Sequence, residues 1–313
     1  MPISKKAKVA VIGEFFVDEI FTGFNVLPNL GEESFARKFH REVGGGAAIT
    51  ACGLAKLGVQ VLAIGSVGKE DGAWLIDRLI SLGVNCSGLH LHRGSATGIT
   101  VSVSTREDRA FFTYYGANKH LRGLLRKPET AETLASCNHI HFACAPDADT
   151  DRRLIGSLRD RAKISIDVQS HMTWLTRPES LKILRLCDIF FPNEQEAGWL
   201  SSAVEPRDIL HRLRDEGLSG VGLKLGGKGA ALLWRRRTFR ADPFPVTTVE
   251  TTGAGDCFNA GFIFGRLRGY SPQRCLTIAN ICGALSTRAL GGIAGFPSLK
   301  ELMDSESHLL TKT

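Results

Sequence analysis

One short segment carries residue types that suit the handling of a phosphate group: residues 251–256, which read Thr-Thr-Gly-Ala-Gly-Asp. The apolar stretch 257–264 follows with the pattern of a buried helix, so the glycines fall at the expected start of that helix. The first N–H groups of a helix lack intrahelical partners and lie at the positive end of its dipole, and both features attract anions. Asp256 can accept a proton from a hydroxyl that attacks a bound phosphate. Alternatively, Asp256 only caps the helix as an ordinary N-cap residue. The presence of all six residues of the segment 251–256 favours the catalytic role.

Two other glycine-rich segments match phosphate-binding motifs only in part. Residues 222–228 have the Walker A spacing, but Gly229 stands where the Mg²⁺-binding Ser or Thr is needed, and a strand pattern follows instead of a helix. Residues 44–46 do not follow a buried strand in the spacing of a dinucleotide-binding fold. We therefore expect neither a P-loop nor a dinucleotide site.

The 8 cysteines and 9 histidines form no recognisable metal-binding or disulfide pattern. The sequence contains no C-x-x-C pair and no H-E-x-x-H motif, and most cysteines lie in apolar stretches. Reduced thiols in a protein core are the expectation. His139 and His141 alternate with apolar residues in the period of a strand, so we interpret them as structural.

The elements that must position these residues alternate between strands and helices. This order predicts an α/β domain with a mostly parallel sheet and helices on both of its faces. Strands are expected at 8–13, 60–66, 139–143, 164–168, 188–191 and 246–249, and helices at 47–57, 70–81, 150–161, 178–185, 194–201 and 207–216.

Two segments interrupt this alternation. Residues 15–43 are rich in phenylalanine and glycine without a long helical period, and residues 97–116 alternate like a β-hairpin around a polar turn at 106–109. No Pro/Ser-rich linker separates these segments from the rest of the chain. We therefore expect one domain over residues 1–313, with a small β-sheet lid, formed from about 15–43 and 96–116, embedded in it.

Composition and charge exclude several classes of protein. The 313 residues are 43% hydrophobic and 23% charged, which is typical of a globular chain and not of a disordered one. No run approaches the roughly 18 apolar residues of a membrane helix, so we expect a cytoplasmic protein without a membrane partner. The net charge of +7 suits an anionic metabolite, and because the basic residues are dispersed, no nucleic-acid partner is expected. The run 235–237 is interpreted as a solvated hairpin tip.

Over nearly its whole length the chain resembles the ribokinase-like, PfkB-type carbohydrate kinases. Residues 250–258 resemble the C-terminal signature of that family, and residues 44–48 are similar to its N-terminal glycine signature. Three further elements occur in the family's order: Gly13 to Asp18, the pair Ala96-Thr97-Gly98 and Gly116-Ala117-Asn118, and Pro192-Asn193-Glu194-Gln195-Glu196.

The resemblance implies a ribokinase-like, three-layer αβα fold and an ATP-dependent kinase. It implies that Asp256 is the catalytic base and that Gly253, Ala254 and Gly255 form an anion hole for the transferred phosphoryl group. The residues implied on the sugar side are Asp18, Gly45, Gly46, Ile49, Thr97, Asn118 and Asp256, and those on the nucleotide side are Asn193, Lys224, Gly226, Gly229, Gly255 and Asn280. Glu196 and Asn193 would organise Mg²⁺ through water, and Glu250 and Thr252 lie at the family's site for a monovalent cation such as K⁺.

Several departures from the family pattern limit what can be said of the substrate. Ile49 stands where the family often has Asn, and Glu250 replaces the usual Asp, which leaves K⁺ dependence open. Residues 167–171 lack the Arg that suits an acidic sugar. We expect a kinase that phosphorylates a hydroxyl of a small sugar or sugar-like alcohol. A nucleoside kinase, with Phe15, Phe16 and Met172 near the base, and a catalytically silent, sugar-binding regulator are the alternatives. An exposed apolar lid predicts a homodimer formed through it.

Overall fold

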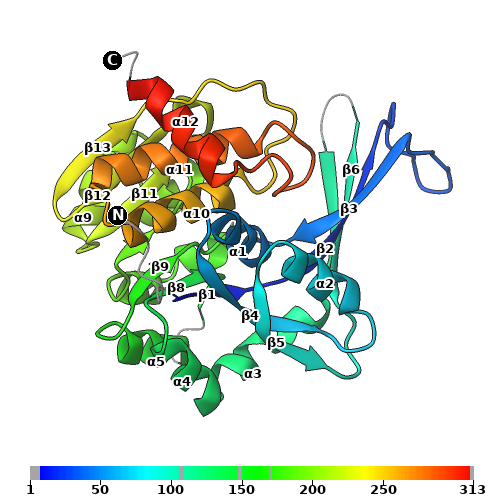
Figure 1. Ribbon diagram of the computed structural model, residues 1–313, viewed down its shortest axis with the longest axis horizontal. Coiled ribbons are helices and arrows are strands. Elements are labelled where there is room, and N and C mark those ends of the chain that lie inside the picture. The colour runs from blue at the N-terminus through cyan, green and yellow to red at the C-terminus, as the bar shows by residue number, and fades with distance from the viewer. Residues whose placement is uncertain (1–7, 106–108, 147–149, 170, 311–313) are drawn as a thin grey trace.

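A sheet of nine strands forms the centre of the molecule (Figure 1). The computed structural model describes residues 8–105, 109–146, 150–169 and 171–310. Strands from β5 across to β11 pair in parallel, whereas β12 and β13 extend the sheet antiparallel. Their order is β13 (Arg237–Ala241), β12 (Ala230–Trp234), β11 (Gly220–Lys224), β10 (Ile189–Phe190), β9 (Lys163–Ile166), β8 (His139–Ala143), β1 (Lys8–Gly13), β4 (Gln60–Gly68) and β5 (Asn85–His92).

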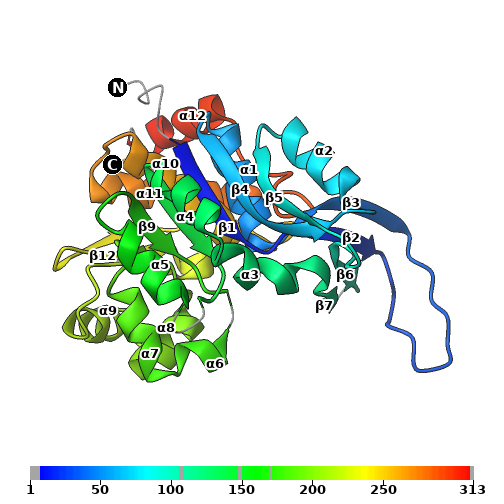
Figure 2. The same ribbon diagram turned by 90° about the horizontal axis from the view of Figure 1, so that it is seen from below.

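Helices cover both faces of this sheet, because the apolar strands bury side chains on each face in a separate hydrophobic core (Figure 2). One core is closed by α1 (Gly46–Lys56), α2 (Ala73–Ser81), α10 (Ala254–Leu267), α11 (Pro272–Ser286) and α12 (Leu299–Leu310). The other is closed by α3 (Leu121–Leu125), α4 (Pro128–Ala135), α5 (Thr150–Leu158), α6 (Met172–Leu175), α7 (Pro178–Leu184), α8 (Glu194–Ser201) and α9 (Pro206–Asp215). The predicted three-layer αβα architecture is confirmed.

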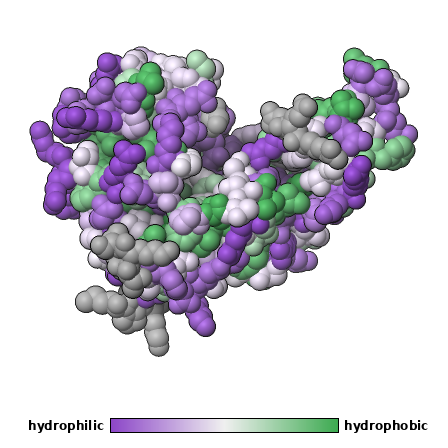
Figure 3. All heavy atoms as spheres, turned by 90° about the horizontal axis from the view of Figure 1, so that it is seen from above, coloured by the Kyte–Doolittle hydropathy of each residue, from purple (hydrophilic) through white to green (hydrophobic). Residues whose placement is uncertain are grey.

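A second sheet of four strands projects from the body (Figures 1 and 2). Its order is β3 (Lys38–Gly44), β2 (Phe16–Thr22), β6 (Gly98–Ser104) and β7 (Arg109–Tyr114). The sheet is mixed, because β2 pairs with β6 in parallel while the two outer pairs are antiparallel. Figure 3 shows the surface hollowed between the body and this projecting arm. We call these strands the lid; residues 106–108 of the predicted turn lie outside the described residues.

The sequence-based prediction of a strand at 246–249 is wrong. This segment leaves β13 through Pro243 and Pro245, which cannot donate backbone hydrogen bonds to a sheet. The N–H groups of Val249 and Glu250 donate instead to the carbonyl of Thr287, at 2.7 and 2.9 Å. Helix α2 also begins three residues later than the predicted residue 70.

The interpretations of the two strand histidines and of the arginine run are confirmed. The hydroxyl of Ser165 bonds to His139 Nε2 at 2.7 Å and to His141 Nδ1 at 2.8 Å inside the sheet, and burial lowers the pKa of these imidazoles to about 4 and about 3. Arg235 and Arg236 form a hairpin tip with φ angles of 46° and 71°. All eight cysteines are free thiols, and Cys86 alone is not buried. No helix among the described residues has the length and apolarity that a membrane crossing requires.

Candidate active site

The glycine turn at the start of α10 is held in a tight backbone geometry. Gly253 caps the helix with φ 73°, a left-handed conformation that glycine adopts without strain. A Cβ at Gly253 would lie 2.8 Å from Ile49 Cδ1 and 2.9 Å from Gly292 Cα, so a larger residue does not fit. Asp256 lies in the first turn of α10 and is buried. The turn therefore presents helix N–H groups beside a carboxylate.

The Asp256 carboxylate lies in surroundings that suit a general base. Gln169 donates from Nε2 to Oδ1 of Asp256 at 3.1 Å, and the Thr50 hydroxyl donates to its backbone carbonyl at 3.2 Å. Burial, reinforced by the negative charge of Asp167, raises the pKa of Asp256 to about 7. A carboxylate whose pKa lies near neutral pH accepts a proton more readily than an exposed aspartate does.

A buried ion pair lies next to the glycine turn. Lys224, at the end of β11, donates to Asp167 Oδ2 at 2.7 Å, and Asn259 donates to the same oxygen at 2.7 Å. Burial opposes both charges, but their mutual attraction outweighs it, so the pKa of Asp167 is lowered and that of Lys224 is raised. A Cβ at Gly255 would lie 3.2 Å from Lys224 Nζ. The ammonium group is thus fixed beside the N–H groups of α10.

Three consecutive glycines lie between two carboxylates. A Cβ at Gly44 would lie 1.8 Å from Oδ1 of Asp18, and a Cβ at Gly46 would lie 2.7 Å from Oδ1 of Asp256. Gly45 has φ 88°, in the left-handed region that favours glycine. The absence of side chains leaves both carboxylates open toward the same stretch of backbone.

Asp18 is a buried carboxylate on lid strand β2. It lies opposite Glu42 in one neighbouring strand and Thr100 in the other. Burial, with the nearby charges of Glu250 and Glu42, raises the pKa of Asp18 to about 7. Within the described residues, the structure shows no hydrogen bond to this carboxylate. Because a buried polar group normally has a partner, Asp18 is suited to bind hydroxyl groups of a ligand.

A cavity of about 390 Å³ opens on the other side of the glycine turn. Its wall is apolar where Phe244, Pro245 and Phe258 face it, and polar near Lys224 and Thr251. Five of the residues predicted for the nucleotide line it: Lys224, Gly226, Gly229, Gly255 and Asn280. An apolar cavity that ends at the N-terminus of a helix fits a flat base with a phosphate chain.

The fifth predicted sequence element forms a capping box at the start of α8. Glu196 N–H donates to Asn193 Oδ1 at 2.8 Å, and Glu196 accepts from the side chain and backbone of Asn193 at 2.9 Å each. Asn193 lies outside the lining of the cavity, but its backbone pairs with Lys224. The negative charge of Glu196 contributes to raising the pKa of both Lys224 and Asp256, so this carboxylate lies near the two.

These residues fit Mg²⁺ that arrives with a nucleotide. Mg²⁺ in such sites keeps several waters and is held by one or two carboxylates together with substrate phosphates. Both Glu196 oxygens accept a hydrogen bond from Asn193, and an ionised carboxylate can accept several hydrogen bonds, including those from waters that surround a metal ion. The described residues contain no group of three or more side chains that could hold a metal ion by themselves. Contact through water is therefore the arrangement that the side chains allow.

Three residues predicted on the sugar side have protein partners. Asn118 is buried and bonds through both side-chain atoms to the backbone of Phe15, at 2.9 and 3.0 Å. The hydroxyl of Thr97 donates to Asp71 Oδ1 at 2.7 Å and accepts from the Gly68 N–H at 3.0 Å. The side chain of Ile49 packs against the glycine turn. These contacts give the three residues positioning tasks that the sequence did not reveal.

Sequence reasoning missed several residues that build the site. Asp167, Gln169 and Asn259 form the network around Lys224 and Asp256. One signal was present, because Asp167 directly follows a buried strand, and ligands of parallel sheets bind at the carboxyl ends of strands. No signal in the sequence pointed to Arg109 of the lid, which bonds to the predicted cation residues Glu250 and Thr252.

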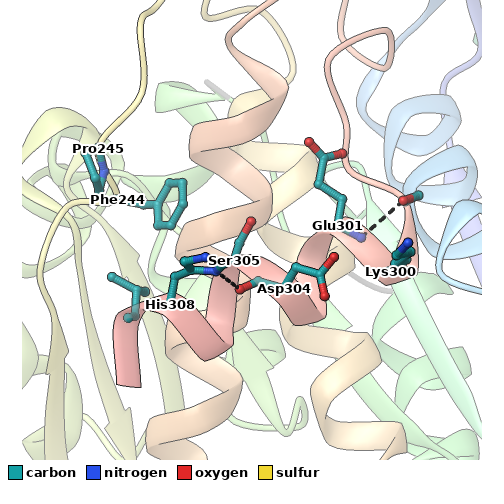
Figure 4. A pocket seen from close by; sticks show the side chains of 9 residues that line it. Phe244, Pro245, Lys300, Glu301, Asp304, Ser305 and His308 are labelled. Carbon is teal, nitrogen blue, oxygen red and sulfur yellow. Dashed lines mark hydrogen bonds between the residues drawn. The ribbon is translucent and has the colours of Figure 1, made fainter. Parts of the chain in front are cut away.

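A separate hollow of about 370 Å³ lies between α12 and the loop after β13 (Figure 4). Phe244 and Pro245 line both this hollow and the cavity beside the glycine turn. On α12, Asp304 accepts from His308 Nδ1 through its backbone carbonyl at 2.6 Å. None of the site residues predicted from the sequence lines this hollow.

Comparison with known proteins identifies relatives along almost the whole chain. The model of the pfkB family of carbohydrate kinases matches residues 6–299. A deoxyribokinase of Salmonella typhi is 28% identical over 306 residues, which cover 94% of this chain and 96% of the relative. A nucleoside kinase of Methanothermobacter thermautotrophicus is 26% identical over 291 residues, with 90% and 91% covered.

A solved structure extends this similarity to the fold. A putative ribokinase II from E. coli, in complex with ATP and Mg²⁺, is 27% identical and superposes with a TM-score of 0.80. The matched region covers 96% of this chain and 99% of the other. The predicted ribokinase-like fold is confirmed.

Proposed function

Because the chain belongs to the pfkB family of carbohydrate kinases, we propose that it transfers the γ-phosphoryl group of ATP to a hydroxyl of a small sugar or sugar-like alcohol. One observation carries this proposal: the buried Asp256 carboxylate lies at the same helix start as the anion hole, between a nucleotide-sized cavity and the glycine string. A regulator that only senses sugar would not need a base at that position.

In the proposed mechanism the sugar lies along Gly44, Gly45 and Gly46, between Asp18 and Asp256. Asp18 accepts hydrogen bonds from two hydroxyls of the sugar, which orients a third hydroxyl toward Asp256. Asp256 takes the proton of that hydroxyl as its oxygen attacks the γ-phosphorus. The attacking oxygen and the ADP leaving group are held in line by the two sides of the glycine turn.

The negative charge that spreads over the transferred group is stabilised by the N–H groups that begin α10 and by the Lys224 ammonium. Gly253, Ala254 and Gly255 form the turn that presents these groups. Asn193 and Glu196 would hold, through water, the Mg²⁺ that is bound with ATP. This ion would neutralise part of the phosphate charge. The ion pair with Asp167 keeps Lys224 in place without removing its charge.

A substrate panel tests the proposal. Purified protein is incubated with ATP and Mg²⁺ and with one furanose, ketose or nucleoside at a time, and ADP release is measured. We expect at least one free sugar to stimulate ADP release well above the rate without an acceptor. Stimulation by nucleosides alone would establish the alternative of a nucleoside kinase, and the absence of any stimulation despite sugar binding would establish a silent regulator.

The pH dependence of the reaction should report the Asp256 carboxyl. Because the base must be ionised, kcat/KM for the sugar should rise with pH through about 7 and then level, with a tenfold fall per pH unit below that value. Asp18 has a similar pKa, so Asp18→Asn serves as the control. Asp18→Asn should raise the KM of the sugar but keep the acidic limb in the pH profile of kcat/KM. Loss of that limb in Asp18→Asn would assign it to Asp18 instead.

We also propose that the protein forms a homodimer through its lid. Large apolar side chains of the lid are exposed, among them Phe39, Phe111, Phe112 and Tyr114. A second copy of the lid would cover them, whereas an open apolar sheet invites aggregation. Light scattering at micromolar concentration should give the mass of two chains, and Phe112→Lys should lower it to that of one. A monomeric wild-type mass would contradict this proposal.

A further inference from the structure

An arginine of the lid contacts the loop before α10. Arg109, the first residue of β7, donates from Nη1 to Glu250 Oε1 at 3.1 Å and to Thr252 Oγ1 at 2.8 Å. It also donates from Nη2 to Thr251 Oγ1 at 3.0 Å. These three acceptors directly precede Gly253 in the sequence. A single guanidinium thus joins the lid to the segment that holds the anion hole.

The residues present do not fit a monovalent cation at Glu250 and Thr252. Oε1 of Glu250 accepts from Arg109 and from the Thr252 hydroxyl, and Oε2 accepts from the Gly291 N–H at 2.7 Å. Both carboxylate oxygens are therefore engaged by donors. A K⁺ ion beside Glu250 would also be repelled by the permanent positive charge of the guanidinium. The Arg109 guanidinium thus lies where the sequence left a monovalent cation possible.

The Arg109–Glu250 pair is better shielded than an ordinary surface ion pair. The side chains are 30% and 13% exposed, respectively. Charge-assisted bonds in such a setting are stronger than those between solvated groups. Arg109 further lies over the Phe111 ring, with 5.3 Å between the guanidinium carbon and the ring centre. The contact can therefore hold the loop in a fixed position.

We infer that Arg109 is a tethered substitute for a monovalent cation: from the lid, it supplies the positive charge that orders residues 250–252 beside the anion hole. The inference rests on the proposed kinase function. It makes Arg109 a positioning residue that touches neither the sugar nor the reacting atoms. Because the positive charge of Arg109 is part of the chain, turnover does not require K⁺. Residues 250–252 are ordered when the lid lies over them.

Cation dependence tests the inference. Turnover of wild type is measured in KCl and in tetramethylammonium chloride at matched ionic strength, with the sugar that gives the fastest ADP release. We expect equal values within about twofold, because matched ionic strength removes differences in screening. Arg109→Ala should lower kcat at least about tenfold, a usual size for coupling between two sites. Added K⁺ or guanidinium ion should restore part of the lost turnover of Arg109→Ala and should not change the turnover of wild type.

A matched control comes from the same lid. Arg41 on β3 pairs with Glu19 at 2.6 Å and lies over Trp74. Arg41→Ala also removes a lid ion pair, so it should keep wild-type turnover and show no response to K⁺. If Arg41→Ala and Arg109→Ala lose turnover alike, the effect is a general loosening of the lid and the inference is overturned.

Thermal unfolding gives a second measurement that does not depend on catalysis. K⁺ should raise the Tm of Arg109→Ala above its value in tetramethylammonium, and should leave the Tm of wild type unchanged. Activation of wild type by K⁺, or a K⁺-specific rise in its Tm, would overturn the inference while leaving the kinase function intact. Absence of kinase activity with every sugar would refute the proposed function, and the Tm comparison would still decide the role of Arg109. If Arg109→Ala fails to fold, the comparison of wild type in KCl and in tetramethylammonium chloride still tests the inference.

Discussion

Asp256→Asn should lower kcat by about 10²–10⁴-fold, the range that a general base contributes. Asparagine keeps the size of the side chain and its ability to accept a hydrogen bond from Gln169, but it cannot take the proton of the sugar hydroxyl. The KM of ATP should change little, because the N–H groups that begin α10 belong to the backbone. Steady-state kinetics with the best sugar of the panel measure both quantities.

The matched control for this substitution is Asp77→Asn. Asp77 is an exposed aspartate on α2, away from the glycine turn. It should keep wild-type kcat, and both variants should keep the wild-type Tm within a few degrees. If Asp256→Asn retains more than about a third of the wild-type turnover, proton transfer to Asp256 is not part of the reaction.

Lys224→Met should affect both stability and turnover. Removing one partner of a buried ion pair leaves Asp167 uncompensated, which costs about 3–5 kcal/mol of the free energy of unfolding. It also removes the positive charge beside Gly255, so kcat should fall at least about 10²-fold. Urea unfolding and steady-state kinetics measure the two effects.

A double variant separates these effects. Lys224→Met with Asp167→Asn removes both charges and leaves a neutral amide that Asn259 can still contact. Much of the lost free energy of unfolding should return, because no unpaired charge remains buried. The loss of turnover should persist. Recovery of turnover together with stability would show that Lys224 acts only through folding.

The fold was predictable because its signals are local. Apolar β-branched runs such as the one in β1 indicate strands buried on both faces, and the helical periods between them leave a parallel sheet as the solution. The glycine turn was also predictable, because Gly253 and Asp256 are neighbours in sequence and their roles depend on one helix start. The absence of a strand at 246–249 was not predictable, because the N–H groups of Val249 and Glu250 bond to the carbonyl of Thr287, which is distant in the sequence.

Contacts between distant segments were beyond prediction from one sequence. Lys224 and Asp167 are separated by 57 residues, and Arg109 and Glu250 by 141. Nothing in the local pattern marks either pair. The raised pKa of Asp256 arises from burial and from Asp167, and both depend on the complete fold. The sequence therefore pointed to Asp256 as the proposed base, but it did not reveal the surroundings that raise the pKa of that carboxyl.

Phosphorus NMR of one reaction mixture tests the central claim most directly. Wild-type protein with ATP, Mg²⁺ and the best sugar should convert ATP to ADP and form a sugar phosphate ester in equal amounts. Asp256→Asn should form neither at a comparable rate, and wild type without sugar should leave ATP intact. Formation of ADP with inorganic phosphate, and without a sugar phosphate, would contradict the assignment of this chain as a sugar kinase.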